Sequence, residues 1–181
     1  MLGLFRRRQK LPADRRPALE REERVLAWAA TAAEQTVVAT NRGLWLPGLN
    51  RLGWHEIHKA VWSGRELQVT PARICEERDG YVVVADEPVV SALLLDPGEV
   101  PDHVRTRVTR SVGFTSYHPV SVTDPSSGGV RIAARRVSGV DGLSWTVRYD
   151  HGARADSTEA RERTAELVAE ARATAEATAP V

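Results

Sequence analysis

Residues 36–70 read TVVATNRGLWLPGLNRLGWHEIHKAVWSGRELQVT, and this stretch decides the fold. It holds three of the five tryptophans, and turn signals separate its short apolar runs. The sequence Asn-Arg-Gly at 41–43, between VVAT and LWL, predicts a hairpin because Asn and Gly tolerate positive φ angles. Pro47-Gly48 ends the second run, and Ser63-Gly64 turns the chain again. The stretch therefore predicts a curved antiparallel meander onto which the rest of the chain packs.

Further strands are predicted on both sides of this meander. Residues 23–32, ERVLAWAATA, suit a short helix or a first strand; we favour the strand because the segment is short for a helix and has no good cap. A polar linker at 76–80 follows the meander. Alternating or continuous apolar runs then predict five strands, at 81–85, 89–95, 114–123, 129–137 and 143–149. The protein is therefore expected to be mainly β.

Two helices complete the prediction. Residues 99–112 place Val100, Val104, Val108 and Val112 in an i, i+4 stripe, which indicates a short amphipathic helix. Residues 157–178 are rich in Ala and Glu, and Asp156 with Glu159 has the spacing of a capping box. The apolar stripe of this second helix is thin, so we expect it to dock lightly; its members are Ala160, Thr164, Leu167, Val168 and Ala171.

The order of these elements predicts three segments. Residues 1–19 contain two prolines and no periodic apolar face, and are expected to form a mobile basic arm. Residues 20–112 are expected to form an antiparallel β-rich domain that ends in the short amphipathic helix. Residues 113–181 are expected to add a three-stranded β segment and a C-terminal helix packed on it. The fold class is therefore α+β.

VVATNRGLWL followed by LGWHEIHKAV resembles bacterial and GRAM-type members of the pleckstrin-homology-like superfold, in which a T-x-x-R-L-h strand precedes a W-x-x-I-x-x-V strand. The matching positions are Thr40, Arg42, Leu44, Trp54, Ile57 and Ala60, although Gly43 is an insertion and Ala60 replaces a valine. The whole chain is also similar to small proteins of high-GC Gram-positive bacteria. The resemblance implies a partly open barrel over residues 20–112. It implies no phosphoinositide site, because the expected turn at 32–36 has no basic residue.

The sequence offers little catalytic chemistry. It contains no glycine-rich nucleotide loop, C-x-x-C, H-E-x-x-H or G-x-S-x-G motif. His55 and His58 are three residues apart, which points them to opposite faces of a strand, and no third metal ligand is evident. Ser116, His118 and Asp124 lie on one expected strand and its loop, without a strained elbow or oxyanion donors. We therefore predict no catalytic residue, no metal and no cofactor.

The single cysteine, Cys75, cannot form an internal disulfide, which favours a reducing cytoplasm. It lies beside Glu76 and Glu77, whose negative charges disfavour a thiolate. We therefore expect a buried structural thiol rather than a reactive one. No apolar run is long enough for a secretory signal or a membrane-spanning helix. The sequence thus favours a non-enzymatic, cytoplasmic protein.

Two surfaces are candidates for binding a protein partner. Trp45 is expected to point outward, since Leu44 and Leu46 would face the core, and beside Arg42 it could anchor a partner or pack under the C-terminal segment. Trp54, Trp62 and Trp145 are expected to be core packing. A second candidate is a basic patch on the polar face of the late strands, which otherwise is simply a solvated face; it would contain Arg131, Arg135 and Arg148.

The N-terminal arm suggests an alternative function. The net charge is only +1, but residues 1–16 carry six basic side chains and one acidic side chain. An apolar anchor adjoins a basic cluster there, formed by Leu4, Phe5, Arg6, Arg7, Arg8 and Lys10. Each basic side chain near an anionic membrane contributes about 1 kcal/mol, which allows weak, salt-sensitive attachment. A plain solubilising tail explains the same residues, and nucleic acid is a poorer partner because the arginines have few aromatic neighbours.

Overall fold

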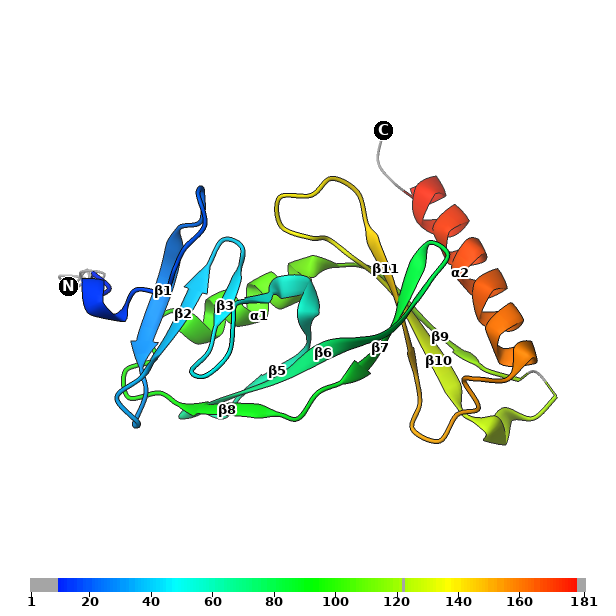
Figure 1. Ribbon diagram of the computed structural model, residues 1–181, viewed down its shortest axis with the longest axis horizontal. Coiled ribbons are helices and arrows are strands. Elements are labelled where there is room, and N and C mark those ends of the chain that lie inside the picture. Colours follow the sequence, from blue (N-terminus) through cyan, green and yellow to red (C-terminus); the bar gives the residue numbers. More distant parts are fainter. Residues whose placement is uncertain (1–9, 122, 179–181) are drawn as a thin grey trace, which may run out of the picture.

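The computed structural model describes residues 10–121 and 123–178 of the 181-residue chain. In this part of the chain, two β-sheets and two α-helices form an elongated α+β fold, with one sheet curled into a half-barrel (Figure 1). The expected α+β class is therefore confirmed. Short 3-10 turns lie at Ala13–Arg15, Trp54–Glu56 and Pro125–Ser127.

The smaller sheet has four antiparallel strands in sequential order: β1 (Val25–Ala30), β2 (Thr36–Thr40), β3 (Gly43–Trp45) and β4 (Leu52–Gly53). The first segment is thus a strand, as we favoured. The hairpin at 41–43 is also confirmed, because Val38 pairs with Trp45 and Ala39 with Leu44. Leu44 and Leu46 are buried, which places the inward face of this hairpin where the alternation predicted it.

The larger sheet has seven strands within the described residues: β5 (Ile57–Trp62), β6 (Glu66–Arg78), β7 (Tyr81–Asp86), β8 (Val90–Leu93), β9 (Val112–Pro119), β10 (Gly129–Arg135) and β11 (Ser144–Tyr149). Their order is β5-β6-β7-β11-β10-β9, and β8 pairs with the first half of β6. The pairing of β7 with β11 is parallel, whereas the other pairs are antiparallel. This parallel contact joins the two halves of the chain.

The polar linker predicted at 76–80 was wrong. Strand β6 continues through Glu76, Glu77 and Arg78, which pair with Val83, Val82 and Tyr81 of β7. Only Asp79-Gly80 forms the turn, with Gly80 at φ +78°, a conformation that favours glycine. The polar side chains remain in a strand because the sheet supplies partners: Arg78 donates to Glu76, and Arg161 reaches Glu76 from the C-terminal helix.

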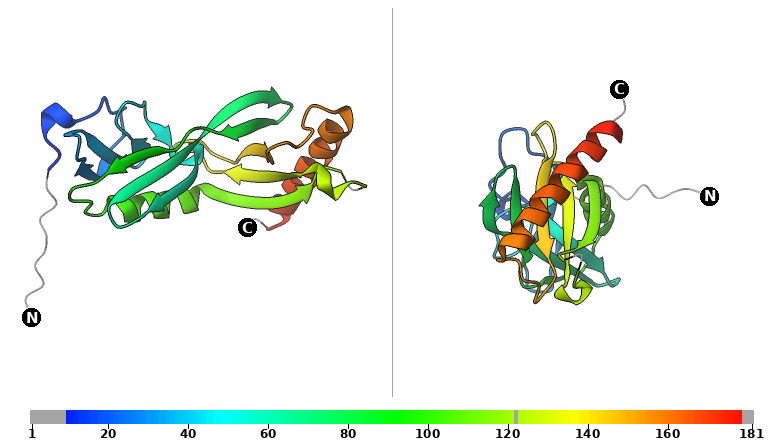
Figure 2. Two further views of the ribbon diagram at one scale, coloured as in Figure 1. Left: turned by 90° about the horizontal axis from the view of Figure 1, so that it is seen from below. Right: turned by 90° about the vertical axis from the view of Figure 1, so that its right-hand side faces the viewer.

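The two helices lie on different parts of the molecule (Figures 1 and 2). Helix α1 (Val100–Ser111) packs against β1, β2 and β5, and buries Val100 and Val104. Helix α2 (Thr158–Thr178) crosses the sheet over β10 and buries all five residues of the predicted stripe. Its first turn is capped by Ser157 rather than Asp156, because Ser157 Oγ accepts from the Ala160 amide at 3.1 Å.

Two hydrophobic cores follow from this arrangement. The first lies between the smaller sheet, α1 and the β5-β6-β8 strands, around Leu44, Trp54 and Leu67. The second lies between α2 and the strands β7, β11, β10 and β9. Trp54 and Trp145 are buried and Trp62 packs on the first core, as expected for packing tryptophans. The β6–β7 hairpin connects the two cores, so the surfaces between them are candidates for a site.

Candidate functional site

Trp45 is not a free anchor on the surface. Its indole Nε1–H donates to Glu23 Oε1 at 3.1 Å, and the side chain is half-buried. Glu23 itself is buried, and its carboxylate also accepts hydrogen bonds from Thr40 Oγ1 at 2.7 Å, Arg51 Nη1 at 2.7 Å and the Glu20 amide at 3.1 Å. Burial alone would raise the pKa of Glu23, but these bonds outweigh it and lower that pKa. The segment before β1, not the C-terminal segment, therefore covers Trp45.

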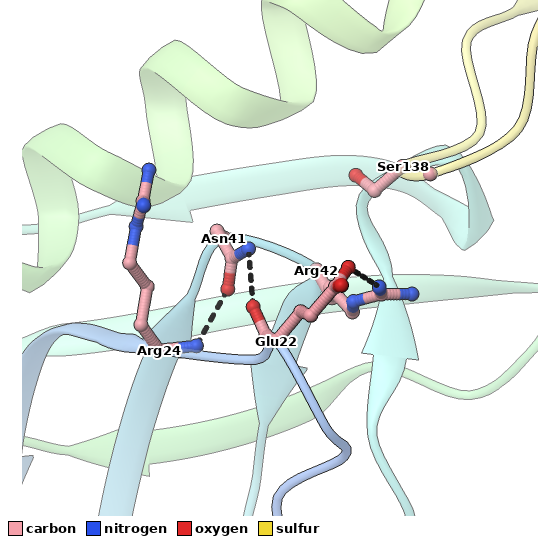
Figure 3. Close-up of a pocket in the computed structure, with 6 residues that line it drawn as sticks. Glu22, Arg24, Asn41, Arg42 and Ser138 are labelled. Atoms are coloured by element: carbon pink, nitrogen blue, oxygen red, sulfur yellow. Dashed lines mark hydrogen bonds and ion pairs between the residues drawn. The ribbon is translucent and has the colours of Figure 1, made fainter.

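Arg42 lies beside a polar cavity of about 320 Å³ between the β2–β3 turn and the β10–β11 loop (Figure 3). Its guanidinium forms long ion pairs with Glu20 at 3.5 Å and Glu22 at 3.6 Å. Asn41 holds the edge of the cavity, accepting from the Arg24 amide at 2.7 Å and donating to the Glu22 carbonyl at 3.1 Å. Ser138 and Gly139 complete the lining. These groups can bind a polar surface, but Glu22 already occupies the guanidinium of Arg42.

The expected basic patch is not assembled. Arg131 is exposed, with its guanidinium 5.4 Å from the Tyr117 ring centroid. Arg148 is half-exposed and bound to Asp86 at 2.8 Å through both carboxylate oxygens. Arg135, expected on the solvated face, is buried, and this expectation was wrong. The reason is that the end of β10 docks on the end of α1, where Arg135 Nη1 donates to Ser111 Oγ at 2.9 Å.

A cluster of ionisable groups instead surrounds Arg135 at the junction between the two cores. His58 Nδ1 lies 2.6 Å from Asp86 Oδ1, so the imidazole N–H donates to a carboxylate that also binds Arg148. Burial lowers the pKa of His58 and of His55, and the positive charge of Arg135 acts in the same direction on both. Burial alone would raise the pKa of Asp86, but the hydrogen bonds from His58 and Arg148 outweigh it and lower that pKa.

A third feature is an exposed apolar face on the outside of β5, β6 and β8. Val61 pairs with Gln68, and Gln68 with Ser91, while Leu93 pairs with Glu66 in the neighbouring row. Because side chains alternate along a strand, Val89 and Leu95 share the face of Ser91 and Leu93. The four large apolar side chains of this face, hereafter the β8 face, are exposed by 37–68%: Val61, Val89, Leu93 and Leu95. Neither helix lies over it (Figure 2).

The backbone of β8 is also open along part of one side. Strand β6 pairs with the other side, and residues 93–95 reach the end of β1 through Ala32 N–H to Leu93 O, Leu95 N–H to Ala30 O and the Thr31–Leu94 bridge. At residues 89–91, no strand in the described part of the chain lies on that side. An open strand edge beside apolar side chains can accept a further strand.

Comparison with protein-family models, curated proteins and solved structures finds no match to this chain. The fold and the geometry of its surfaces are therefore the basis for a functional proposal. No helix among the described residues is both long and apolar enough to cross a membrane. In the same part of the chain, no group of three or more His, Cys, Asp or Glu side chains is placed to hold a metal ion.

The remaining sequence-based candidates occupy separate places. Ser116 and His118 share one face of β9, but Asp124 caps the turn at Pro125–Ser127 and accepts from Ser126, so the three do not form a triad. Cys75 is exposed, not buried as expected, because it is the extra residue of a bulge between the Ile74–Val84 and Glu76–Val83 pairs. Of the arm candidates, Lys10 is exposed; the others lie outside the described residues, namely Leu4, Phe5, Arg6, Arg7 and Arg8.

The β8 face and the junction cluster were not predicted from the sequence. The run VVSALLL at 89–95 did contain a signal for the face, because alternation cannot bury every apolar side chain of a strand covered on one side only. The junction had no comparable signal. His58, Asp86 and Arg135 are far apart in sequence, and their proximity depends on the pairing of β6 with β7 and of β7 with β11.

Proposed function

We propose that the protein is a non-enzymatic, cytoplasmic binding module that recognises a protein partner through the β8 face. The observation that carries this proposal is the combination of exposed Val89, Leu93 and Leu95 with an open backbone edge on the same strand. Several large apolar side chains exposed on one face of a protein favour an interaction site there. Burial of apolar surface contributes roughly 25 cal/mol per Å², so covering these side chains favours association.

The partner that fits is an extended segment of another protein that lies as an additional strand beside residues 89–91. Its backbone would bond to the open edge of β8, and its alternate side chains would contact the β8 face. The row of Val61, Gln68 and Ser91 is uncharged, whereas Glu66 lies opposite Leu93 in the neighbouring row and accepts a hydrogen bond from Gln68 Nε2 at 2.9 Å. Uncharged or apolar side chains therefore suit this part of the partner.

A pleckstrin-homology-like origin of residues 20–112 belongs to the same proposal. It is supported by the order of elements, in which short antiparallel strands precede one helix whose Val100 and Val104 enter the first core. Proteins of this superfold recognise lipids, peptides and proteins alike, so the resemblance does not choose the ligand. The exposed apolar side chains favour a protein.

A photo-crosslinking amino acid placed at Val89, which is exposed beside the open edge, tests the proposal in the full-length protein in cells of the source. We expect a crosslinked product with a second protein, and we expect Ser91→Lys to abolish it because a lysine disfavours an added strand. The matched control is Val140→Lys, at an exposed apolar position on the β10–β11 loop, which should leave the product unchanged.

Two outcomes would contradict the proposal. The first is the absence of any protein crosslink from position 89 when the variant is expressed and folded. The second is a product of twice the mass of this chain, because it would mean that a second copy, not another protein, covers the β8 face.

A further inference from the structure

Arg135 is a buried cation that lacks a counter-ion. Only 8% of the residue is exposed, and no carboxylate in the described part of the chain lies within 4 Å of its guanidinium. Its one hydrogen bond to those residues runs from Nη1 to Ser111 Oγ at 2.9 Å. Ser111 is a neutral partner, and its hydroxyl already lies 2.7 Å from the Val108 carbonyl. Buried arginines are normally paired, so this arrangement needs an explanation.

The charged group that acts on Arg135 is a second cation, Arg148. Burial lowers the pKa of Arg135, and the charge of Arg148 lowers it further. His55 and His58 also feel the charge of Arg135, which lowers the pKa of each imidazole. The cluster thus combines two guanidinium groups and two half-buried imidazoles from four different elements, namely the Trp54–Glu56 turn, β5, β10 and β11.

The acidic groups of the cluster are engaged elsewhere. Asp86 accepts from His58 at 2.6 Å and from Arg148 at 2.8 Å, and forms no ion pair with Arg135. Glu56 lies close enough to raise the pKa of His55, but its Oε2 accepts the Gly53 amide at 2.6 Å. Neither carboxylate therefore neutralises the buried guanidinium, although both limit the net charge of the junction.

We propose that Arg135 binds an oxyanion, a phosphate or a carboxylate group, at the junction between the two cores, and that Arg148, whose Nη1 is already bound to Asp86, contributes its positive charge to the site. A guanidinium presents several N–H donors in a planar fork that matches two oxygens of such a group. An anion there would supply the charge that Arg135 lacks, and desolvation makes such a pairing stronger than at the surface. Arg148 is half-exposed and would lie at the solvent side of the site. This inference is independent of the β8 face.

Thermal unfolding of the full chain tests the proposal. The wild type is compared in sodium phosphate and in sodium chloride at pH 7.5 and equal ionic strength, and then in sodium acetate. We expect phosphate or acetate to raise the Tm by roughly 5 °C or more when the anion reaches 100 times its Kd. A response to phosphate alone identifies a phosphate site, and a response to acetate as well identifies a general carboxylate and phosphate site.

The variant Arg135→Met should lose this response, because the buried fork is gone. In chloride its Tm should equal or exceed that of the wild type, since a buried charge without a counter-ion is removed. Arg131→Met, on the same strand but exposed, should retain the full response. If Arg135→Met does not fold, Arg148→Gln serves instead and should weaken the apparent affinity for the anion at least threefold.

A second measurement follows the histidines directly. NMR titration of the imidazole signals should show that phosphate shifts the midpoints of His55 and His58 to higher pH, because an anion offsets the charge of Arg135. A wild type that neither anion stabilises would overturn the proposal. So would a phosphate response that survives unchanged in both Arg135→Met and Arg148→Gln, since that would place the bound anion elsewhere.

Discussion

The indole N–H of Trp45 donates to Glu23 Oε1 at 3.1 Å, across 22 residues of chain. Alternation along β3 points the Trp45 side chain away from the core, and this bond holds the segment before β1 over it. It also helps to satisfy a carboxylate that is fully removed from solvent, together with the donors of Thr40 and Arg51. Glu23 thus fixes the segment before β1 on the smaller sheet, and its removal has measurable consequences.

Glu23→Ala should lower the free energy of unfolding by about 3 kcal/mol, because it leaves Arg51, Thr40 and Trp45 without their acceptor. Urea unfolding followed by circular dichroism measures this change. Glu20→Ala is the matched control, since Glu20 pairs with the same Arg51 but is exposed, and it should cost less than about 1 kcal/mol. Equal losses in the two variants would show that burial of Glu23 does not decide its contribution.

Stability should fall as the pH is lowered from neutral. The pKa values of His55 and His58 are lowered by burial, so the unfolded chain binds more protons than the native one below about pH 6.5. The free energy of unfolding therefore decreases as the pH falls through this range. It decreases again below about pH 4, because the pKa values of Asp86 and Glu23 are lower in the native protein, so that the unfolded chain again binds more protons.

Urea unfolding at a series of pH values in phosphate-free buffer checks this dependence. His55→Gln should flatten the decrease between pH 7 and pH 5.5, because it removes one of the two imidazoles whose pKa is lowered by burial. An unaltered slope in His55→Gln would contradict the assignment of this decrease to His55.

Leu167→Ala should destabilise the protein by about 2–4 kcal/mol, because Leu167 of α2 is almost completely buried in the second core. Thermal unfolding should show the loss, and limited proteolysis should cut α2 faster than in the wild type. Glu166→Ala tests the solvent side of the same helix turn, where only an exposed ion pair with Arg163 is lost, and should change stability by less than about 0.5 kcal/mol.

Attachment to a membrane through the basic arm stays a prediction. If the arm acts in this way, full-length protein should float with vesicles containing phosphatidylserine at low salt and sediment free of them at high salt. Deletion of residues 1–10 should abolish flotation. Flotation that resists both salt and the deletion would exclude the arm as the attachment site.

Much of the fold could be predicted from the sequence, because local patterns suffice for it. The turn at 41–43, the valine stripe of α1 and the five buried residues of α2 all follow from periodicity and turn chemistry. The linker at 76–80 was missed for a non-local reason. Polar residues prefer a loop only when no partner is available, and β7 and Arg161 provide partners.

The candidate site was less predictable. Trp45 and Arg135 were both assigned to an exposed face because alternation shows which face a side chain lies on, but not what covers that face. Trp45 is covered by Glu23, and Arg135 by the end of α1. Cys75 shows the opposite error, since a single bulge residue turned an expected buried thiol outward.

The sequence by itself determined the α+β class, the hairpins, the two amphipathic helices and the inward faces of the strands, because each depends on neighbours within a few residues. Tertiary structure decided which outward faces remain open: β8 is left uncovered, whereas Arg135 is closed in beside His55 and His58. The physical reason is that burial of a face depends on elements brought together by sheet pairing, and that pairing joins residues far apart in the chain.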